Sequence, residues 1–193
     1  MTSTAAPLST LLLAMLLGIA QAEDSTELAQ LMQRMAMQRH GHAHFVERTY
    51  LRILQRPLES RGELFYEAPD RLEKRTLEPK PESLVLDQGK VTIHRGRRQY
   101  QLSLHDFPQL IPFIDSIRAT LAGDLATLQR VYVVNFMATN KSWTLTLVPR
   151  DPQLAQLIQQ IRIAGLDERV TGVEIVHRDG DRSELSIQPI ATE

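Results

Sequence analysis

Residues 62–93, GELFYEAPDRLEKRTLEPKPESLVLDQGKVTI, carry the pattern that decides the fold. Apolar residues recur at every second position in three short runs: Leu64 and Tyr66, Leu84 and Leu86, Val91 and Ile93. A period of two places such side chains on one face of a β-strand. Prolines 69, 79 and 81 and the run Asp87-Gln88-Gly89 fall between the runs, as turns between antiparallel strands do. The stretch therefore predicts an antiparallel sheet with one apolar face.

The bulk composition indicates a single globular domain. The chain has 193 residues, which suits one domain with a sizeable core. Its 42% hydrophobic and 23% charged residues are ordinary for globular proteins. The formal net charge is −1, so no overall field favours nucleic acid or an anionic membrane. The absence of cysteine excludes disulfides, thiolate metal sites and cysteine catalysis together.

The N-terminus predicts export. Leu8 to Ile19 is an apolar run of about a dozen residues, shorter than the roughly 20 that a membrane-spanning helix needs. Ala20-Gln21-Ala22 follows as an A-x-A cleavage site, with acidic residues directly after it. Residues 1–7 lack Lys and Arg, so a membrane anchor is the alternative. We interpret residues 1–22 as a signal peptide cleaved after Ala22, and residues 23–193 as one exported domain in the periplasm.

The next segment predicts a helix and then a strand. STELAQLMQRMAMQRH, from Ser25, has leucines and methionines near the 3.6 period of an amphipathic helix that ends at Gly41. His40, His42 and His44 would share one face of a strand and could bind zinc or copper. No carboxylate–histidine pattern completes a typical metal site, so a solvated strand start is the simpler interpretation. We expect a strand over Phe45–Leu54 and a loop over Pro57–Arg61.

The middle of the chain predicts helices. Asp106 can cap a helical region, and Pro112 should kink or divide it. Its apolar set is unusually wide: Phe107, Leu110, Ile111, Phe113, Ile114, Ile117 and Leu121. A helix this apolar must face protein on more than one side, either as a core helix or as a lid over a hydrophobic cavity. A second helix is expected over Asp124–Arg130.

The remainder predicts a return to strands. Alternating residues indicate strands at Val131–Met137, Trp143–Val148, Val170–His177 and Arg182–Pro189, with hairpin turns between two of the pairs. The segment from Gln153 to Ala164 supports either a short helix or an extension of the sheet. No internal repeat or low-complexity tract is present.

The motifs of common enzymes are absent from the sequence. It contains no G-x-S-x-G elbow, P-loop, dinucleotide fingerprint or H-E-x-x-H. Carboxylates and histidines are scattered without a spacing typical of acid–base catalysis. We therefore expect no enzyme activity, no cofactor and no metal, and a function based on apolar shape. An acyl-transfer or hydrolytic enzyme is the remaining alternative, because catalytic groups can come from distant strands.

Several of these features together resemble the LolA family of periplasmic lipoprotein carriers. The features are Phe45, the run Gly62-Glu63-Leu64-Phe65-Tyr66 with Pro69, the run Asp87-Gln88-Gly89-Lys90, and Pro112-Phe113. The resemblance covers about residues 25–190. It implies an α+β fold: an unclosed, strongly curved antiparallel sheet, or half-barrel, with an N-terminal helix and a mid-chain helical lid. The strand patterns in the sequence predict about seven or eight strands for it.

The resemblance also implies a function and a site. A carrier of this kind would bind acyl chains or another hydrophobic lipid, take them from an inner-membrane donor complex and pass them to an outer-membrane acceptor, working as a monomer without nucleic acid. The expected ligand-binding residues line the concave sheet and the lid: Leu64, Tyr66, Leu102, Leu104, Phe113, Ile114, Ile117, Trp143, Leu145 and Leu147.

Three positions depart from the family pattern, and they bear on the cargo. The family typically has Arg before the Pro of the second strand, where it holds the lid shut; this chain has Ala68. Glu47 stands where the family usually has Gln, and Gln88 interrupts the Asp-Gly turn. The chain is similar to a divergent branch encoded with aryl-polyene pigment pathways, so a glycolipid or polyene-lipid cargo competes with lipoproteins. The alternative function is a periplasmic module that senses lipoproteins or binds a protein, without transport.

Overall fold

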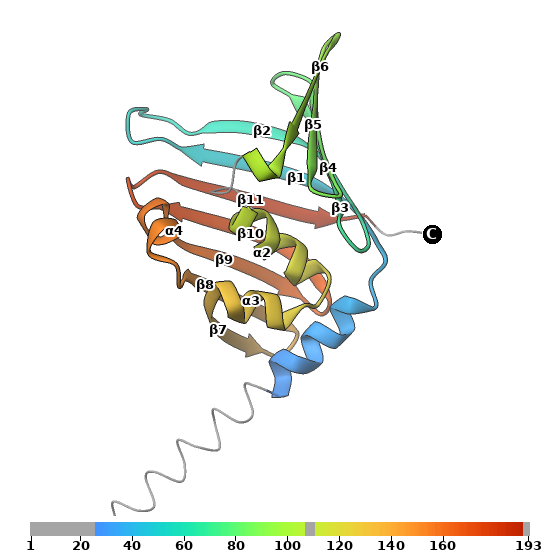
Figure 1. Ribbon diagram of the computed structural model, residues 1–193, viewed down its shortest axis with the longest axis vertical. Coiled ribbons are helices and arrows are strands. Elements are labelled where there is room, and N and C mark those ends of the chain that lie inside the picture. Colours follow the sequence, from blue (N-terminus) through green and yellow to red (C-terminus); the bar gives the residue numbers. More distant parts are fainter. Residues whose placement is uncertain (1–25, 107–110, 191–193) are drawn as a thin grey trace, which may run out of the picture.

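The computed structural model describes residues 26–106 and 111–190, without the side chains of Pro112 and Phe113. One antiparallel sheet of 11 strands spans this part of the chain, in the spatial order β6-β5-β4-β3-β2-β1-β11-β10-β9-β8-β7. β6 and β7 lie at its two edges, so the sheet is not closed (Figure 1). The strands are β1 (His40–Tyr50), β2 (Leu58–Glu67), β3 (Arg71–Glu78), β4 (Glu82–Asp87), β5 (Lys90–Arg95), β6 (Arg98–Ser103), β7 (Tyr132–Thr139), β8 (Ser142–Pro149), β9 (Ile158–Leu166), β10 (Arg169–His177) and β11 (Arg182–Pro189).

Helices cover one face of this sheet. They are an N-terminal helix of residues 26–36, η1 (Leu104–Asp106), α2 (Ile111–Leu121), α3 (Leu125–Val131) and α4 (Pro152–Leu157). Figure 1 shows α2 and α3 lying across the β7–β11 half, with the N-terminal helix beside α3 at one end of the strands. Asp124 and Asp151 cap α3 and α4 by accepting hydrogen bonds from backbone N–H groups three residues on. The predicted α+β half-barrel is confirmed.

The main core lies between the helices and the β7–β11 half of the sheet. Strand pairing places Phe136, Leu145 and Ile163 in one row across three strands. The N-terminal helix contributes Leu28, Leu31, Met32 and Met35 to the same core. Gly165 lies opposite Trp143, and a Cβ there would come within 2.1 Å of the indole ring. Each fully buried Leu or Ile stabilises the fold by about 1.5–3 kcal/mol, so this half holds the protein together.

The hairpin between β4 and β5 explains the unusual Asp-Gln-Gly turn. Gln88 and Gly89 are its two central residues, with φ values of 47° and 73°. A two-residue turn with two positive φ values matches the twist of an antiparallel hairpin. Gln88 therefore does not interrupt the turn; it occupies one of its two central positions.

Most predicted elements are confirmed, and the differences have local causes. The strand predicted over Phe45–Leu54 is wrong in both bounds: β1 begins at His40 and ends at Tyr50, because its antiparallel partners β2 and β11 begin opposite Thr49 and Tyr50 and offer no pairing beyond. The predicted loop at Pro57–Arg61 lies mostly within β2. The N-terminal helix ends at residue 36, well before Gly41, because His40 and Gly41 pair with β2.

Three further differences concern the count and the helices. The prediction of seven or eight strands is too low for the 11 strands present. Two of the strands it did not assign are β3 (RLEKRTLE), which lacks an apolar alternation of its own, and β9, which lies in the segment left open between helix and strand. Pro112 lies in the first turn of α2 and does not divide the helix. The helix start predicted at Asp106 is followed by residues 107–110, which lie outside the described residues. The ambiguous segment from Gln153 to Ala164 contains both alternatives, α4 followed directly by β9.

Candidate functional site

The N-terminal half of α2 covers a small apolar cluster on the inner face of β4 and β5. Leu86, Val91 and Leu104 form its buried centre, with Leu72, Leu84 and Ile93 around them. Ile111 and Ile114 pack onto it from α2. This cluster is separate from the main core, so α2 lies over two apolar regions rather than one.

The C-terminal half of α2 is fixed in the main core. Ala119 belongs to that core, and the polar residues Ser116 and Thr120 are each only 1% exposed. Thr120 donates a hydrogen bond to the Ser116 carbonyl at 2.7 Å. Ser116 also forms a hydrogen bond with the side chain of Tyr132, whose burial raises the pKa of its hydroxyl to about 12. One end of α2 is thus anchored firmly, while the other rests on a few aliphatic side chains.

Apolar surface continues from the small cluster toward the free edge of the sheet. Strand register places Leu102 beside Val91 and Tyr100 beside Ile93, on the same face. Tyr100 is 46% exposed and Leu102 is 38% exposed. Leu64, Leu84 and Ile93 are half-buried. The inner face of the β2–β6 half therefore offers apolar side chains that the helices leave accessible.

Tyr66 is the buried polar member of this face. It is 9% exposed and pairs with Leu72 across β2 and β3. Burial raises the pKa of its hydroxyl, and the charges of Arg39 and Arg118 oppose that effect. Neither the Tyr66 hydroxyl nor Arg118 Nε has a hydrogen-bond partner among the described protein atoms. Because a buried hydroxyl without a partner is costly, this donor is available to water or to a bound molecule.

A compact polar cluster interrupts the apolar inner face near the other end of β1. Lys74 Nζ lies 2.5 Å from Glu47 Oε2, and their side chains are 32% and 24% exposed. Ser60 donates to the same carboxylate at 3.1 Å and Ser183 at 3.3 Å. Lys74 also lies 5.1 Å above the Phe45 ring. The Glu47 carboxylate thus links four neighbouring strands, β3, β2, β1 and β11, and places both charges on the concave face.

The predicted site residues divide between the two apolar regions. Leu104 and Ile114 meet in the small cluster, and Leu64, Tyr66 and Leu102 share its face of the sheet. Trp143, Leu145 and Leu147 instead belong to the main core, where both leucines are 0% exposed. Ile117 is half-buried on α2, and the side chain of Phe113 lies outside the described residues. These ten residues therefore do not line a single surface.

Several inner-face residues were missing from the sequence prediction. Leu84, Leu86, Val91 and Ile93 complete the surface beneath α2. Their period-two alternation was visible in the sequence and could have placed them in the site. The Glu47–Lys74 pair had no such signal, because the two residues are far apart in the sequence and meet only through the β1–β2–β3 register.

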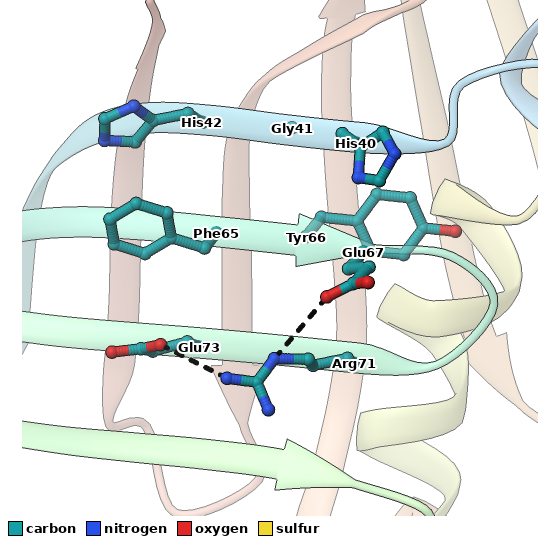
Figure 2. Close-up of a pocket in the computed structure, with 8 residues that line it drawn as sticks. All are labelled: His40, Gly41, His42, Phe65, Tyr66, Glu67, Arg71 and Glu73. Carbon is teal, nitrogen blue, oxygen red and sulfur yellow. Dashed lines mark ion pairs between the residues drawn. The ribbon is translucent and has the colours of Figure 1, made fainter.

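The opposite, convex face carries the histidines. His40, His42 and His44 occupy alternate positions of β1, and no group of three potential metal ligands occurs among the described residues. His42 stacks on Phe65 with ring centroids 4.4 Å apart, and its Nε2 lies 3.4 Å from Glu63. A hollow of about 360 Å³ lies at this end of β1–β3. Figure 2 shows residues that line it, among them Arg71, which forms ion pairs with Glu67 and Glu73. Its charges are largely neutralised within the hollow, which suits a structural role.

The fold and the inner face define an open half-barrel whose apolar concave surface is partly covered by a helix. The chain belongs to the family described as LolA-like outer membrane lipoprotein carrier proteins, whose model matches residues 20–192. No curated protein matches the sequence significantly.

Solved structures are similar at low sequence identity. A LolA superfamily protein from Nitrosomonas europaea is 12% identical, with 86% of this chain and 94% of that chain covered and a TM-score of 0.44. MucB in the MucA/MucB complex of Pseudomonas aeruginosa is 13% identical, with 86% and 58% covered and a TM-score of 0.48. The lipoprotein LppX of Mycobacterium tuberculosis is 8% identical, with 87% and 99% covered and a TM-score of 0.45.

Within the described residues, none of the helices has the length and apolar character required to cross a membrane.

Proposed function

We propose that this protein carries a hydrophobic lipid, whose acyl chain or other apolar part lies on the inner face of the β2–β6 half beneath α2. The observation that carries the proposal is the small apolar cluster under the N-terminal half of α2, together with the accessible apolar surface beside it. Membership of a family described as lipoprotein carriers supports this use of the surface.

The mechanism is competition between α2 and the ligand for one surface. Ile111 and Ile114 together contribute about 1.5–3 kcal/mol if each half-buried side chain is worth half of a full burial. Three or four methylenes placed on the same leucines and valine recover about the same amount, at ~0.8 kcal/mol each. The N-terminal half of α2 can therefore lift while Ser116 and Ala119 stay in the main core. Because the two burials nearly balance, affinity stays modest and cargo can be handed on.

The polar features set the ligand's orientation. The Glu47–Lys74 pair is half-buried on the concave face, so the apolar part of a ligand is better placed toward β4–β6 and its polar part toward the pair. An acylated lipoprotein, a glycolipid and a polyene lipid each have an apolar part and a polar part, so each fits this orientation. Ala68 leaves α2 without the arginine latch of the family, which favours a cargo other than general lipoproteins.

The cellular context is part of the same proposal. We infer that residues 1–22 are a signal peptide cleaved after Ala22, and that the domain acts in the periplasm as a monomer. It would receive cargo from an inner-membrane complex and pass it to an outer-membrane acceptor. No catalytic step is involved.

The test is native mass spectrometry of the protein purified from its own periplasm, followed by organic extraction. A bound acyl, glycolipid or polyene species is the expected result and identifies the cargo class. An empty protein that also rejects fluorescent acyl probes would refute carriage. A stoichiometric protein partner with no extractable lipid would assign the chain to the sensing or interaction class.

A further inference from the structure

One end of the half-barrel exposes a group of aliphatic side chains that neither the fold nor the proposed lipid site uses. The loop between β1 and β2, residues 51–57, places Ile53 at 88% exposure and Leu54 at 42%. Leu58, the first residue of β2, is 54% exposed, and Leu157 at the end of α4 is 49% exposed. Figure 1 shows the β1–β2 loop, the β10–β11 turn and α4 at the same end of the sheet.

Hydrogen bonds join these three segments into one surface. Arg52 N donates to Asp181 Oδ1 at 2.9 Å, and Arg52 Nη1 donates to the Asp179 carbonyl at 2.7 Å. Arg178, in the same turn, donates through its backbone N to the Leu157 carbonyl at 3.0 Å and through Nε to the Ala155 carbonyl at 2.9 Å. The loop is therefore fixed against the turn, and the turn against α4. The exposed side chains are held outward on a supported surface rather than on a free tail.

The charge around these side chains is positive, in contrast to the whole chain. Residues 48–61 contain four arginines and one glutamate, a net charge of +3 in a chain of net −1. Arg48 and Arg61 pair with Glu59, whereas Arg56 forms no ion pair within the described residues. The adjoining turn, residues 178–181, has one arginine and two aspartates, so the combined net charge is +2.

We propose that this end of the half-barrel docks on the surface of an anionic phospholipid bilayer. Ile53 and Leu54 enter the boundary between headgroups and acyl chains, and the neighbouring Arg56, which has no ion-pair partner among the described residues, contacts lipid phosphates. Exposed aliphatic residues flanked by arginines are the combination that binds anionic membrane interfaces. A protein partner could also cover aliphatic residues, but the unpaired arginine beside them favours a densely anionic surface.

Docking here would also orient the carrier. β2 begins directly after the loop, and Ser60 near its start donates a hydrogen bond to Glu47 on the concave face. The polar cluster thus lies just behind the docked loop, so a lipid's polar group would face the bilayer. This inference goes beyond the proposed lipid carriage and does not depend on it, since vesicle binding and acyl-probe binding are separate measurements.

The test is flotation of the purified, exported protein with phosphatidylglycerol-containing vesicles and with neutral phosphatidylcholine vesicles. We expect binding to the anionic vesicles that weakens with salt. Ile53→Ser should weaken that binding by roughly tenfold or more, from the lost burial of one aliphatic side chain. Arg56→Glu should weaken it by about 25-fold, because it removes one positive charge and adds a negative one.

Two matched variants control for the loss of an exposed apolar residue and for the change in charge. Met137→Ser removes an apolar residue of similar exposure, 75%, from the edge strand β7. Arg97→Glu makes the same charge change at the β5–β6 turn. Both should bind vesicles like the wild type, and all four variants share its N-terminus, so any contribution from that end cancels. Failure of the wild type to bind anionic vesicles, or an equal loss in a control variant, would overturn the docking surface. Unchanged acyl-probe binding by Ile53→Ser would show that carriage is unaffected.

Discussion

Truncation of Ile114 tests whether α2 and the ligand compete for the same surface. Ile114 is half-buried against the cluster of Leu86, Val91 and Leu104. Ile114→Ala removes three carbons, worth about 2.4 kcal/mol at full burial and therefore about 1.2 kcal/mol at half burial. That loss falls on the closed, empty state, because the ligand-bound state has already lifted this end of the helix. We expect affinity for an acyl probe to rise about sevenfold, since each 1.4 kcal/mol is a factor of ten.

The assay is a fluorescence titration with an acyl probe, with a thermal melt of each variant to check the fold. Leu125→Ala is the matched control: it shortens a partly buried residue of α3 that packs on the main core, so it should lower stability but leave probe affinity unchanged. Leu84→Asp changes the sheet side of the surface and should weaken binding at least tenfold, because a carboxylate would have to be buried beneath the chain. Unchanged or weaker binding by a folded Ile114→Ala variant would refute the competition.

Three further predictions concern stability. The pKa of Tyr132 is about 12 in the folded state and near 10 when exposed, so its contribution to the free energy of unfolding is intact below pH 10 and falls as pH rises toward 12. Between pH 9 and pH 11.5, the free energy of unfolding measured in urea should therefore fall by about 2 kcal/mol less in Tyr132→Phe than in the wild type. Gly165→Ala should lower the free energy of unfolding by about 3 kcal/mol, because its Cβ meets the Trp143 ring, and an unchanged melting temperature would contradict that packing. Lys74→Met should lower the free energy of unfolding by about 1–2 kcal/mol more in the presence of Glu47 than in a Glu47→Gln background. If the two losses are equal, the coupling energy of this double-mutant cycle is zero and the ion pair contributes nothing to stability.

The sequence by itself determined the local elements and the family. Alternating residues located β4, β5, β8 and β11, and Asp124 marked the start of α3, because strand period and helix capping depend on neighbours in the chain. The order of these elements, with the Gly62–Tyr66 and Asp87–Lys90 motifs, carried the resemblance to the LolA family, and that resemblance implied the half-barrel. The boundaries of β1 were predicted less well, since Ile53 and Leu54 read as strand residues but have no strand to pair with.

Only the tertiary structure decided which apolar residues are core and which form accessible surface. Leu147 and Leu102 look alike in sequence, each alternating with polar residues in a strand, yet the first is fully buried under the main helices and the second is 38% exposed. The difference depends on where the helices lie across the sheet. The meeting of Glu47 with Lys74, the two-part anchoring of α2 and the supported Ile53 loop likewise arise from contacts between segments distant in the chain. Local patterns cannot encode such contacts, because they specify which face of an element is apolar but not what will cover it.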